Sequence, residues 1–215
     1  MKHLAIIADG NRRWAVANDL PPKAGYVQGL TAIERCCDWA IGNGVKYLTV
    51  YCFSTENWNR PQNEVDHIMD LARWYFEEKR EWYIAAGISV CFAGRRDRLA
   101  SDIVEKLCKM EDATAGGKAL QLTICVDYGG RDEIMNAIAS GARTEEEISE
   151  ALYIKAPDPD IIVRTGGEMR LSNFLLWQSA YAELFFSPIY FPAIDIMELD
   201  AIMAEYNCRK RNFGS

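Results

Sequence analysis

Short apolar segments alternate with longer helical patterns along this chain of 215 residues, and this alternation restricts its fold most strongly. Most of the segments are apolar on consecutive residues, which is typical of strands that are covered on both faces. The expected strands are 3–8, 45–53, 88–94, 120–126, 160–164 and 183–187. The expected helices are 26–42, 63–86, 98–110, 132–140 and 145–153, the last with a capping box of Thr144 and Glu147. The pattern predicts an α/β fold with a central, mainly parallel six-stranded sheet flanked by helices.

Composition narrows the classes of partner and compartment. The formal net charge is −7, so general electrostatic attraction to nucleic acid is not expected. The seven cysteines are odd in number and contain no CxxC pair, which indicates free thiols in a reducing cytoplasm. No basic segment leads into an apolar one at the start, and no run could span a bilayer. We therefore expect a cytoplasmic protein.

Polar motifs follow three of the expected strands. They are "DGNRR" after the first strand, "STENWNRP" after the second and "RTGGEMRLSN" after the fifth. Ligands of such sheets gather at the carboxyl ends of the strands. We therefore expect these three loops to form one binding site.

Two of these loops have the composition of anion-binding turns. In the first, Gly10 lets backbone N–H groups approach an anion and Arg13 can bind phosphate oxygens in a fork. In the second, Arg164 and Arg170 flank two glycines. Each loop alone also fits a plain glycine turn with surface arginines. Together, in an acidic protein, they favour a pair of substrates that each carry a diphosphate.

A diphosphate leaving group calls for a divalent cation, and Mg²⁺ prefers carboxylates, water and substrate phosphate. Asp9 stands beside the first anion-binding turn, and Glu183 lies among apolar residues at the start of the last expected strand. A buried carboxylate is costly unless it is paired or binds a metal. Glu183 is therefore either a metal ligand or the partner of a nearby arginine.

The motifs taken together resemble the cis-prenyltransferases, the undecaprenyl diphosphate synthase family. The matching segments are "IADGNRRWA", "LTVYCFSTENWNRP", "DYGGR" and "DIIVRTGGEMRLSNFLLWQSAYAELFF". They extend from residue 3 to the C-terminal "RKRNFG", so the resemblance covers essentially the whole chain, 1–215, as a single catalytic domain. It implies a homodimeric, Mg²⁺-dependent enzyme that joins an allylic isoprenoid diphosphate to isopentenyl diphosphate and gives a cis-prenyl diphosphate of short to medium chain. Peripheral membrane contact is expected only if the product is long.

The resemblance also assigns roles to individual residues. It implies that Asp9 assists the metal and catalysis, that Asn57 takes part in proton removal, and that Glu183 is a second metal ligand. An asparagine is a poor base, so Asn57 is expected to orient a diphosphate oxygen or a water. The residues that the resemblance places at the substrates are Gly10, Asn11, Arg12, Arg13, Trp14, Tyr26, Ser54, Thr55, Glu56, Trp58, Arg60, Arg164, Arg170, Leu171 and Ser172.

Several positions depart from the family pattern. Pro22 and Tyr26 stand where the family usually has an arginine and a histidine at the allylic diphosphate, and Asn212 replaces a C-terminal arginine. The losses predict weaker diphosphate binding, or a different reaction such as head-to-middle condensation of the lavandulyl type or cyclisation. Cys52 and Val126 stand where long-chain members often have alanine; this is either a shorter product tunnel or ordinary core variation. A non-catalytic partner subunit is a further alternative, which the retained charged residues disfavour.

Overall fold

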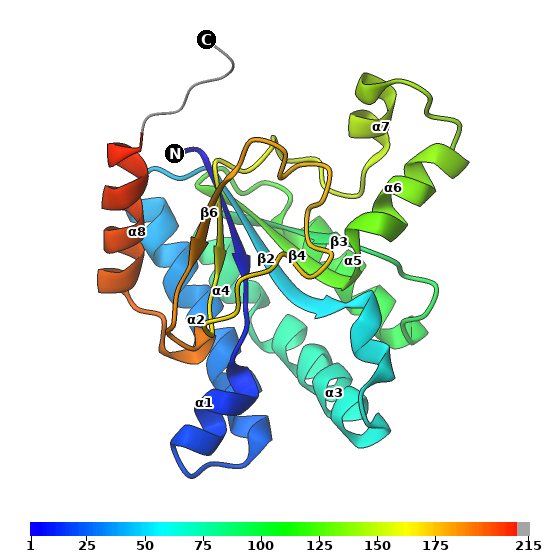
Figure 1. Ribbon diagram of the computed structural model, residues 1–215. Coiled ribbons are helices and arrows are strands. Elements are labelled where there is room, and N and C mark those ends of the chain that lie inside the picture. Colours follow the sequence, from blue (N-terminus) through cyan, green and yellow to red (C-terminus); the bar gives the residue numbers. More distant parts are fainter. Residues whose placement is uncertain (210–215) are drawn as a thin grey trace.

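The computed structural model describes residues 1–209, and its centre is a six-stranded sheet in the order β3-β4-β2-β1-β5-β6 (Figure 1). All five strand pairings are parallel. The strands are β1 His3–Ile7, β2 Tyr47–Ser54, β3 Ile88–Ala93, β4 Leu120–Tyr128, β5 Ile161–Arg164 and β6 Glu183–Phe186. The predicted α/β class and six-stranded sheet are confirmed, and the sheet is parallel throughout.

The helices occupy the connections between these strands. They are α1 Asn11–Ala17, α2 Pro22–Gly42, α3 Gln62–Glu78, α4 Arg80–Ala85, α5 Ser101–Thr114, α6 Gly130–Ala139, α7 Glu145–Ala151 and α8 Ile196–Cys208, with short 3₁₀ helices η1 Thr55–Asn59 and η2 Phe191–Ala193. Within residues 1–209, no helix is both long and apolar enough to cross a membrane.

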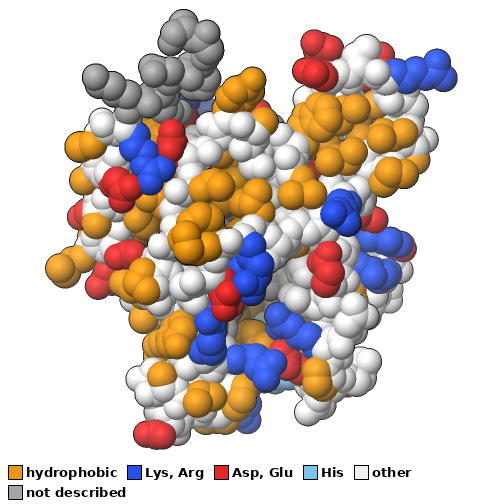
Figure 2. All heavy atoms as spheres, in the orientation of Figure 1, with side chains coloured by type: hydrophobic (Ala, Val, Ile, Leu, Met, Phe, Trp, Pro, Cys, Tyr) orange, Lys and Arg blue, Asp and Glu red, His pale blue; other side chains and the backbone are white. Residues whose placement is uncertain are grey.

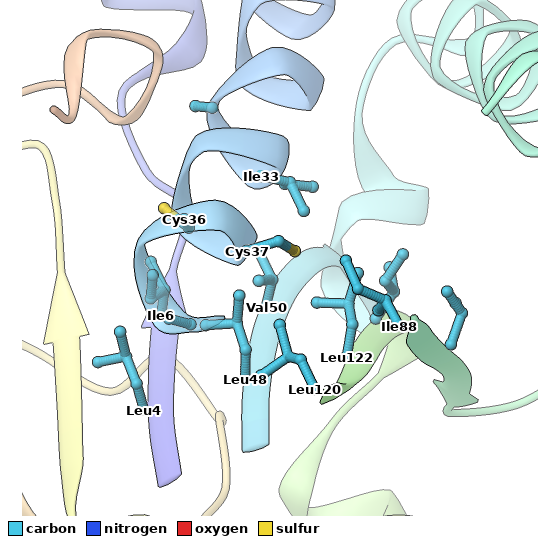
Figure 3. Packing of buried hydrophobic residues seen from close by; sticks show 14 of the residues in the cluster. Leu4, Ile6, Ile33, Cys36, Cys37, Leu48, Val50, Ile88, Leu120 and Leu122 are labelled. Atoms are coloured by element: carbon cyan, nitrogen blue, oxygen red, sulfur yellow. The ribbon is translucent and has the colours of Figure 1, made fainter. Parts of the chain in front are cut away.

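Strand β1 is buried because an apolar cluster packs against each of its two faces. Leu4 and Ile6 join the larger apolar cluster, to which α2, α3, α4, α5 and α8 contribute, whereas Ala5 and Ile7 join a smaller cluster on the opposite face. Figure 3 shows α2 of the larger cluster lying over the strands, with Ile6, Leu48 and Val50 extending from β1 and β2 toward this helix. A continuous apolar run in the sequence is thus explained by two covered faces.

Most helix boundaries differ from the expected ones. Helix α5 spans Ser101–Thr114 instead of 98–110, and α6 spans Gly130–Ala139 instead of 132–140. Helix α2 begins at Pro22 instead of residue 26, because proline has no N–H to lose in the first helical turn. The expected helix 63–86 divides at Lys79 into α3 and α4, and the Tyr75 and Tyr83 hydroxyls are hydrogen-bonded across this division at 2.7 Å. Helix α7 ends at Ala151, two residues early, although its capping box is present. Helix α8 was not expected.

The topology brings the three polar loops together. Strand β1 pairs with β2 on one side and with β5 on the other, so that Ile7 lies in register with both Tyr51 and Arg164. The carboxyl ends of these three strands therefore meet at one edge, as predicted. The expectation about Asn212 falls outside the described residues.

Candidate active site

A polar cavity of about 750 Å³ lies at this edge of the sheet. In Figure 2, Lys and Arg side chains gather in the lower middle of the visible face with acidic side chains between them, above the end of the molecule that carries α1. Eleven of the predicted site residues line the cavity: Asp9, Gly10, Asn11, Arg12, Arg13, Tyr26, Ser54, Asn57, Arg60, Arg164 and Ser172. The three loops thus form one site, as the sequence predicted.

The turn after β1 depends on glycine at position 10. Gly10 has a φ of +99°, and a Cβ there would lie 2.6 Å from the Tyr190 ring. Only glycine adopts this conformation so close to another side chain without strain. The turn leads directly into α1, and it places the Arg13 guanidinium 5.3 Å from the centre of the Tyr190 ring.

Asp9 is held between two arginines at the centre of the site. Its carboxylate accepts hydrogen bonds from Arg164 at 2.8 Å and from Arg13 at 3.2 Å. Burial alone would raise the pKa of Asp9, but the hydrogen bond and charge of Arg164, with the charge of Arg13, outweigh it and lower the pKa. Asp9 is therefore ionised at neutral pH and fixed in place.

Arg164 is the most buried cation of the site, with 5% of its surface exposed. Besides Asp9, it donates to the Ser172 hydroxyl at 2.7 Å and to the Arg170 carbonyl at 2.6 Å. Two buried polar atoms at the cavity, Arg164 Nε and Asn11 Oδ1, have no hydrogen-bond partner among the described residues.

A second charged cluster joins α1, α2 and α3 on the other side of the cavity. Glu64 accepts hydrogen bonds from Tyr26 at 2.7 Å, from Arg60 at 3.1 Å and from Arg12 at 3.1 Å. Burial and the hydrogen bond to Glu64 raise the pKa of the Tyr26 hydroxyl, so it stays protonated and acts as a donor. Tyr26 thus supplies a hydrogen bond at this wall, but no positive charge.

The loop after β2 is an ordered 3₁₀ helix. The Asn57 amide oxygen accepts a hydrogen bond from the Ser54 N–H at 3.2 Å, within a capping box that both residues form. Trp58 turns away from the cavity, and its indole N–H donates to the buried Asp127 at 2.9 Å. Of these residues, Ser54 and Asn57 reach the cavity, whereas Trp58 anchors the loop beneath it.

An apolar pocket of about 90 Å³ adjoins the polar cavity between the sheet and α2 and α3. Ala8, Asn11, Tyr26, Cys52 and Phe53 line both spaces, so the two share a wall. Cys52 is exposed and lines both spaces. Cys52 and Val126 both line this apolar pocket next to the charged site, so the interpretation of a shorter product tunnel stays a prediction.

Some predicted site residues lie elsewhere. Arg170 is directed to the surface and pairs with Glu168, while Leu171 packs against the smaller apolar cluster. Thr55 and Glu56 do not line the cavity, and neither does Trp14.

Glu183 lies far from Asp9 within one chain, and its assignment as a second metal ligand stays a prediction. Glu183 lies in register with Ile161, which pairs with Leu4, five residues before Asp9. At about 3.3 Å per residue, this places Glu183 roughly 16 Å away along the strands. Its carboxylate instead forms an ion pair with Arg209 at 2.7 Å, which is the alternative considered from the sequence.

The donor set at the cavity fits Mg²⁺ only with substrate oxygens included. Residues 1–209 contain no group of three or more His, Cys, Asp or Glu side chains that could hold a metal ion. Asp9 nevertheless offers an ionised, hard oxygen donor in the cavity. Since Mg²⁺ commonly binds through one or two carboxylates and substrate phosphates, Asp9 is compatible with such a shared ion.

Three residues of the site were missed from the sequence. Thr165 donates to the Asp9 carbonyl at 2.8 Å and accepts from the Asp9 N–H at 3.0 Å; its place inside "RTGG" was the available signal. Glu64 had a signal in its spacing of four residues from Arg60 on the helical pattern. Tyr190 follows β6 in irregular structure, and no local pattern pointed to it.

Comparisons with known proteins agree with this geometry. The undecaprenyl diphosphate synthase family model (Prenyltransf) matches residues 7–214. An isoprenyl transferase of Aquifex pyrophilus is 42% identical, with 99% of this chain and 95% of the relative covered. One from Fusobacterium nucleatum is also 42% identical over the same shares.

Two solved structures show the same fold. One is lavandulyl diphosphate synthase from Lavandula x intermedia in complex with dimethylallyl diphosphate, with a TM-score of 0.94, 30% identity, and 100% and 98% of the two chains covered. The other is a probable undecaprenyl diphosphate synthase from Campylobacter jejuni, with a TM-score of 0.86, 32% identity, and 100% and 99% covered. The chain belongs to the undecaprenyl diphosphate synthase family of prenyl-transferring enzymes.

Proposed function

We propose that this enzyme condenses an allylic isoprenoid diphosphate with isopentenyl diphosphate and releases a cis-prenyl diphosphate of short to medium chain, with the whole chain acting as one catalytic domain. The observation that supports this function most directly is the wall shared by the polar cavity and the apolar pocket. A prenyl diphosphate has the same two parts, a charged head and an apolar tail. Cys52 and Phe53 lie where the head would join the tail.

The reaction begins when the bond between the allylic carbon and diphosphate oxygen breaks and the electron pair leaves with diphosphate. Arg12, Arg13 and the N–H groups after Gly10 bind the leaving group and stabilise its charge. Mg²⁺, held by Asp9 and diphosphate oxygens when bound, supplies further neutralisation of that charge.

Isopentenyl diphosphate binds on the Arg164 side of the cavity, next to Ser172. Its double bond attacks the allylic cation, a new carbon–carbon bond forms, and a proton leaves the neighbouring carbon. Asn57 orients the oxygen that accepts this proton, since an amide is itself a poor base. The apolar pocket keeps water from the cation while the chain grows.

The size of the pocket supports a short product. A cavity of about 150 Å³ admits benzene, with six carbons, whereas this pocket holds about 90 Å³. It therefore accepts less than a six-carbon ring, and at most one five-carbon unit, without moving side chains. Cys52 and Val126 take up part of the volume that alanine would leave open.

We also propose a cytoplasmic homodimer. Support comes from β6, an edge strand on which Leu184 is 37% exposed, and from the absence within residues 1–209 of a group of three or more side chains that could hold a metal ion. In a dimer across this edge, Glu183 of each copy would act at the site of the other. Light scattering after gel filtration tests the assembly, and a monomer at micromolar concentration would contradict it.

The reaction itself is tested with purified enzyme and Mg²⁺. Dimethylallyl, geranyl and farnesyl diphosphates are each incubated alone and with isopentenyl diphosphate, and the products are identified by mass spectrometry. We expect product only when isopentenyl diphosphate is present. Absence of diphosphate release from every donor would contradict the proposal.

One observation favours a second candidate, the head-to-middle condensation of two dimethylallyl units. The TM-score is 0.94 to lavandulyl diphosphate synthase in complex with dimethylallyl diphosphate, and 0.86 to the Campylobacter jejuni protein. Product from dimethylallyl diphosphate alone would establish this reaction and exclude regular elongation.

A further inference from the structure

Asn173 joins three segments at the edge of the active site. Its side-chain oxygen accepts from the Arg131 N–H at 2.9 Å, and its carbonyl accepts from the Gly130 N–H at 2.7 Å. Its amide N–H₂ group donates to the Glu56 carboxylate at 2.8 Å. Both ends of one asparagine side chain thus connect the start of α6 with η1.

The backbone at this position suits asparagine. Asn173 has a φ of +65°, and the neighbouring Ser172 has a φ of +49°. Asparagine and aspartate tolerate this left-handed region better than other residues with a side chain. Aspartate can therefore replace Asn173 with the same shape and backbone, and it changes only the hydrogen-bonding character of one terminal atom.

The "YGG" of the "DYGGR" motif provides the space that this arrangement needs. A Cβ at Gly129 would lie 2.7 Å from the Asn173 amide nitrogen and 2.7 Å from the Thr55 hydroxyl. A Cβ at Gly130 would lie 2.9 Å from Leu176. The two glycines let η1 and the segment after β5 pack against the start of α6. The motif therefore has a structural role, although none of the proposed reaction steps uses it.

A continuous path of contacts runs through Asn173 to the centre of the site. Asp9 accepts from Arg164, Arg164 donates to the Ser172 hydroxyl, and Ser172 is followed by Asn173, which donates to Glu56. Glu56 and Asn57 are adjacent on η1. The tips of β1, β5 and β2 are therefore linked by hydrogen bonds even without a ligand.

We propose that Asn173 is a positioning residue: it holds η1, and with it Asn57, at a set distance from the Arg164–Ser172 side of the cavity. The proposal rests on the proposed function for its kinetic consequence. Asn173 lies outside the cavity lining, so its effect on the reaction passes through Glu56 and Ser172.

The ionisation of Glu56 is consistent with this arrangement. Burial would raise the pKa of Glu56, but the hydrogen bond from Asn173 and those from its own backbone and neighbouring hydroxyls outweigh it and lower the pKa. Glu56 is therefore an anion that needs a donor. An aspartate at position 173 would place a second carboxylate against it instead.

The test uses N173D, E56Q and the double variant N173D/E56Q. N173D keeps the acceptor for the Arg131 N–H and replaces the donor to Glu56 by repulsion. The free energy of a hydrogen bond to a charged group corresponds to a change of roughly one to two orders of magnitude. We therefore expect kcat/KM for isopentenyl diphosphate to fall roughly 10- to 100-fold, mostly through kcat. In the double variant, the glutamine amide at position 56 can donate to the new carboxylate at position 173, so activity should recover to within a few-fold of E56Q alone.

A matched control is N43D. Asn43 is the C-cap residue of α2, near the amino end of β2 and away from the candidate active site. Its amide donates to the Trp39 carbonyl at 2.9 Å. The same chemical change there should leave kcat/KM unchanged. The proposal would be overturned if N173D had wild-type activity. It would also be overturned if the double variant were as impaired as N173D while E56Q alone was near normal.

A second readout does not require activity. Hydrogen–deuterium exchange of the amides of residues 54–60 should be faster in N173D than in wild type or N43D, and should return toward the wild-type rate in the double variant. If the wild-type enzyme proved inactive on isoprenoid diphosphates, the proposed function would fail while this exchange pattern would still decide the role of Asn173. Unchanged exchange in N173D would overturn it.

Discussion

Phe76 on α3 offers a direct test of how the apolar pocket sets product length. Its ring lines the pocket, is 6% exposed, and packs edge-on against Phe92 with ring centres 4.9 Å apart. Phe76→Ala removes a six-carbon ring from a pocket of about 90 Å³. Since a cavity of about 150 Å³ admits benzene, the enlarged pocket gains room for at least one further five-carbon unit.

The substitution also destabilises the protein, and the size of that effect decides the assay conditions. Replacing a buried phenylalanine by alanine costs about 3–5 kcal/mol, within a total stability of about 5–15 kcal/mol. For a domain of this size, each kcal/mol lowers Tm by about 2–4 °C, so a fall of roughly 6–20 °C is expected. Product should therefore be analysed at about 20 °C, well below the transition of a typical domain.

The assay compares chain lengths by mass spectrometry after incubation with a dimethylallyl or geranyl donor and excess isopentenyl diphosphate. Leu107→Ala is the control, because Leu107 is buried on α5 at 1% exposure but does not line the pocket. Its stability cost is about 2–5 kcal/mol. We expect longer products from Phe76→Ala only. An unchanged product distribution, or equal lengthening in both variants, would refute the reasoning.

Three further outcomes are expected. Asp9→Asn should lower kcat by a factor on the order of 10²–10³, because it removes the ionised oxygen donor while keeping the shape of the side chain. Steady-state diphosphate release measures this kcat. A near-normal rate would contradict the proposed role of Asp9. Tyr26→His combined with Pro22→Arg should lower KM for the allylic diphosphate about tenfold or more, and unchanged kinetics would show that the cationic contacts are not limiting. His3 is buried and neutral with a pKa lowered to about 4, chiefly by desolvation, against 6.5 when unfolded. The unfolded chain then binds the extra proton between these values, so stability falls by about 3 kcal/mol as pH drops from about 7 to about 4. Urea titrations should show that slope lost in His3→Gln but kept in His67→Gln.

The sheet could be predicted from the sequence because local pattern and tertiary environment agree. A strand buried on both faces must be apolar throughout, and residues 4–7 are. The convergence of the three polar loops followed from the same reasoning, since parallel strands end at one edge. Asp9, Arg13 and Arg164 were assigned to one site on that basis, and the structure brings them within hydrogen-bond distance.

The direction of individual side chains could not be predicted in this way. Arg170 and Trp58 belong to site motifs, yet one pairs with Glu168 at the surface and the other with the buried Asp127. Trp58 is directed by a partner that is distant in the chain. Arg170 is directed by an acidic neighbour two residues away, which competes with the cavity for its guanidinium. Glu183 was placed correctly at the start of a strand, but the register of that strand, which separates it from Asp9, has no signature in local sequence.

The strand order also has a consequence for how this enzyme is made. Strand β1 emerges from the ribosome well before β5, one of its two partners, which begins at Ile161. Until that segment has been synthesised, one edge of β1 stays open and its apolar residues lack part of their cover. Such distant pairing slows folding and leaves an exposed edge that promotes aggregation. Asp9 thus acquires its partner Arg164 late, and a nascent chain that stops before β5 carries the first half of the active site without the second.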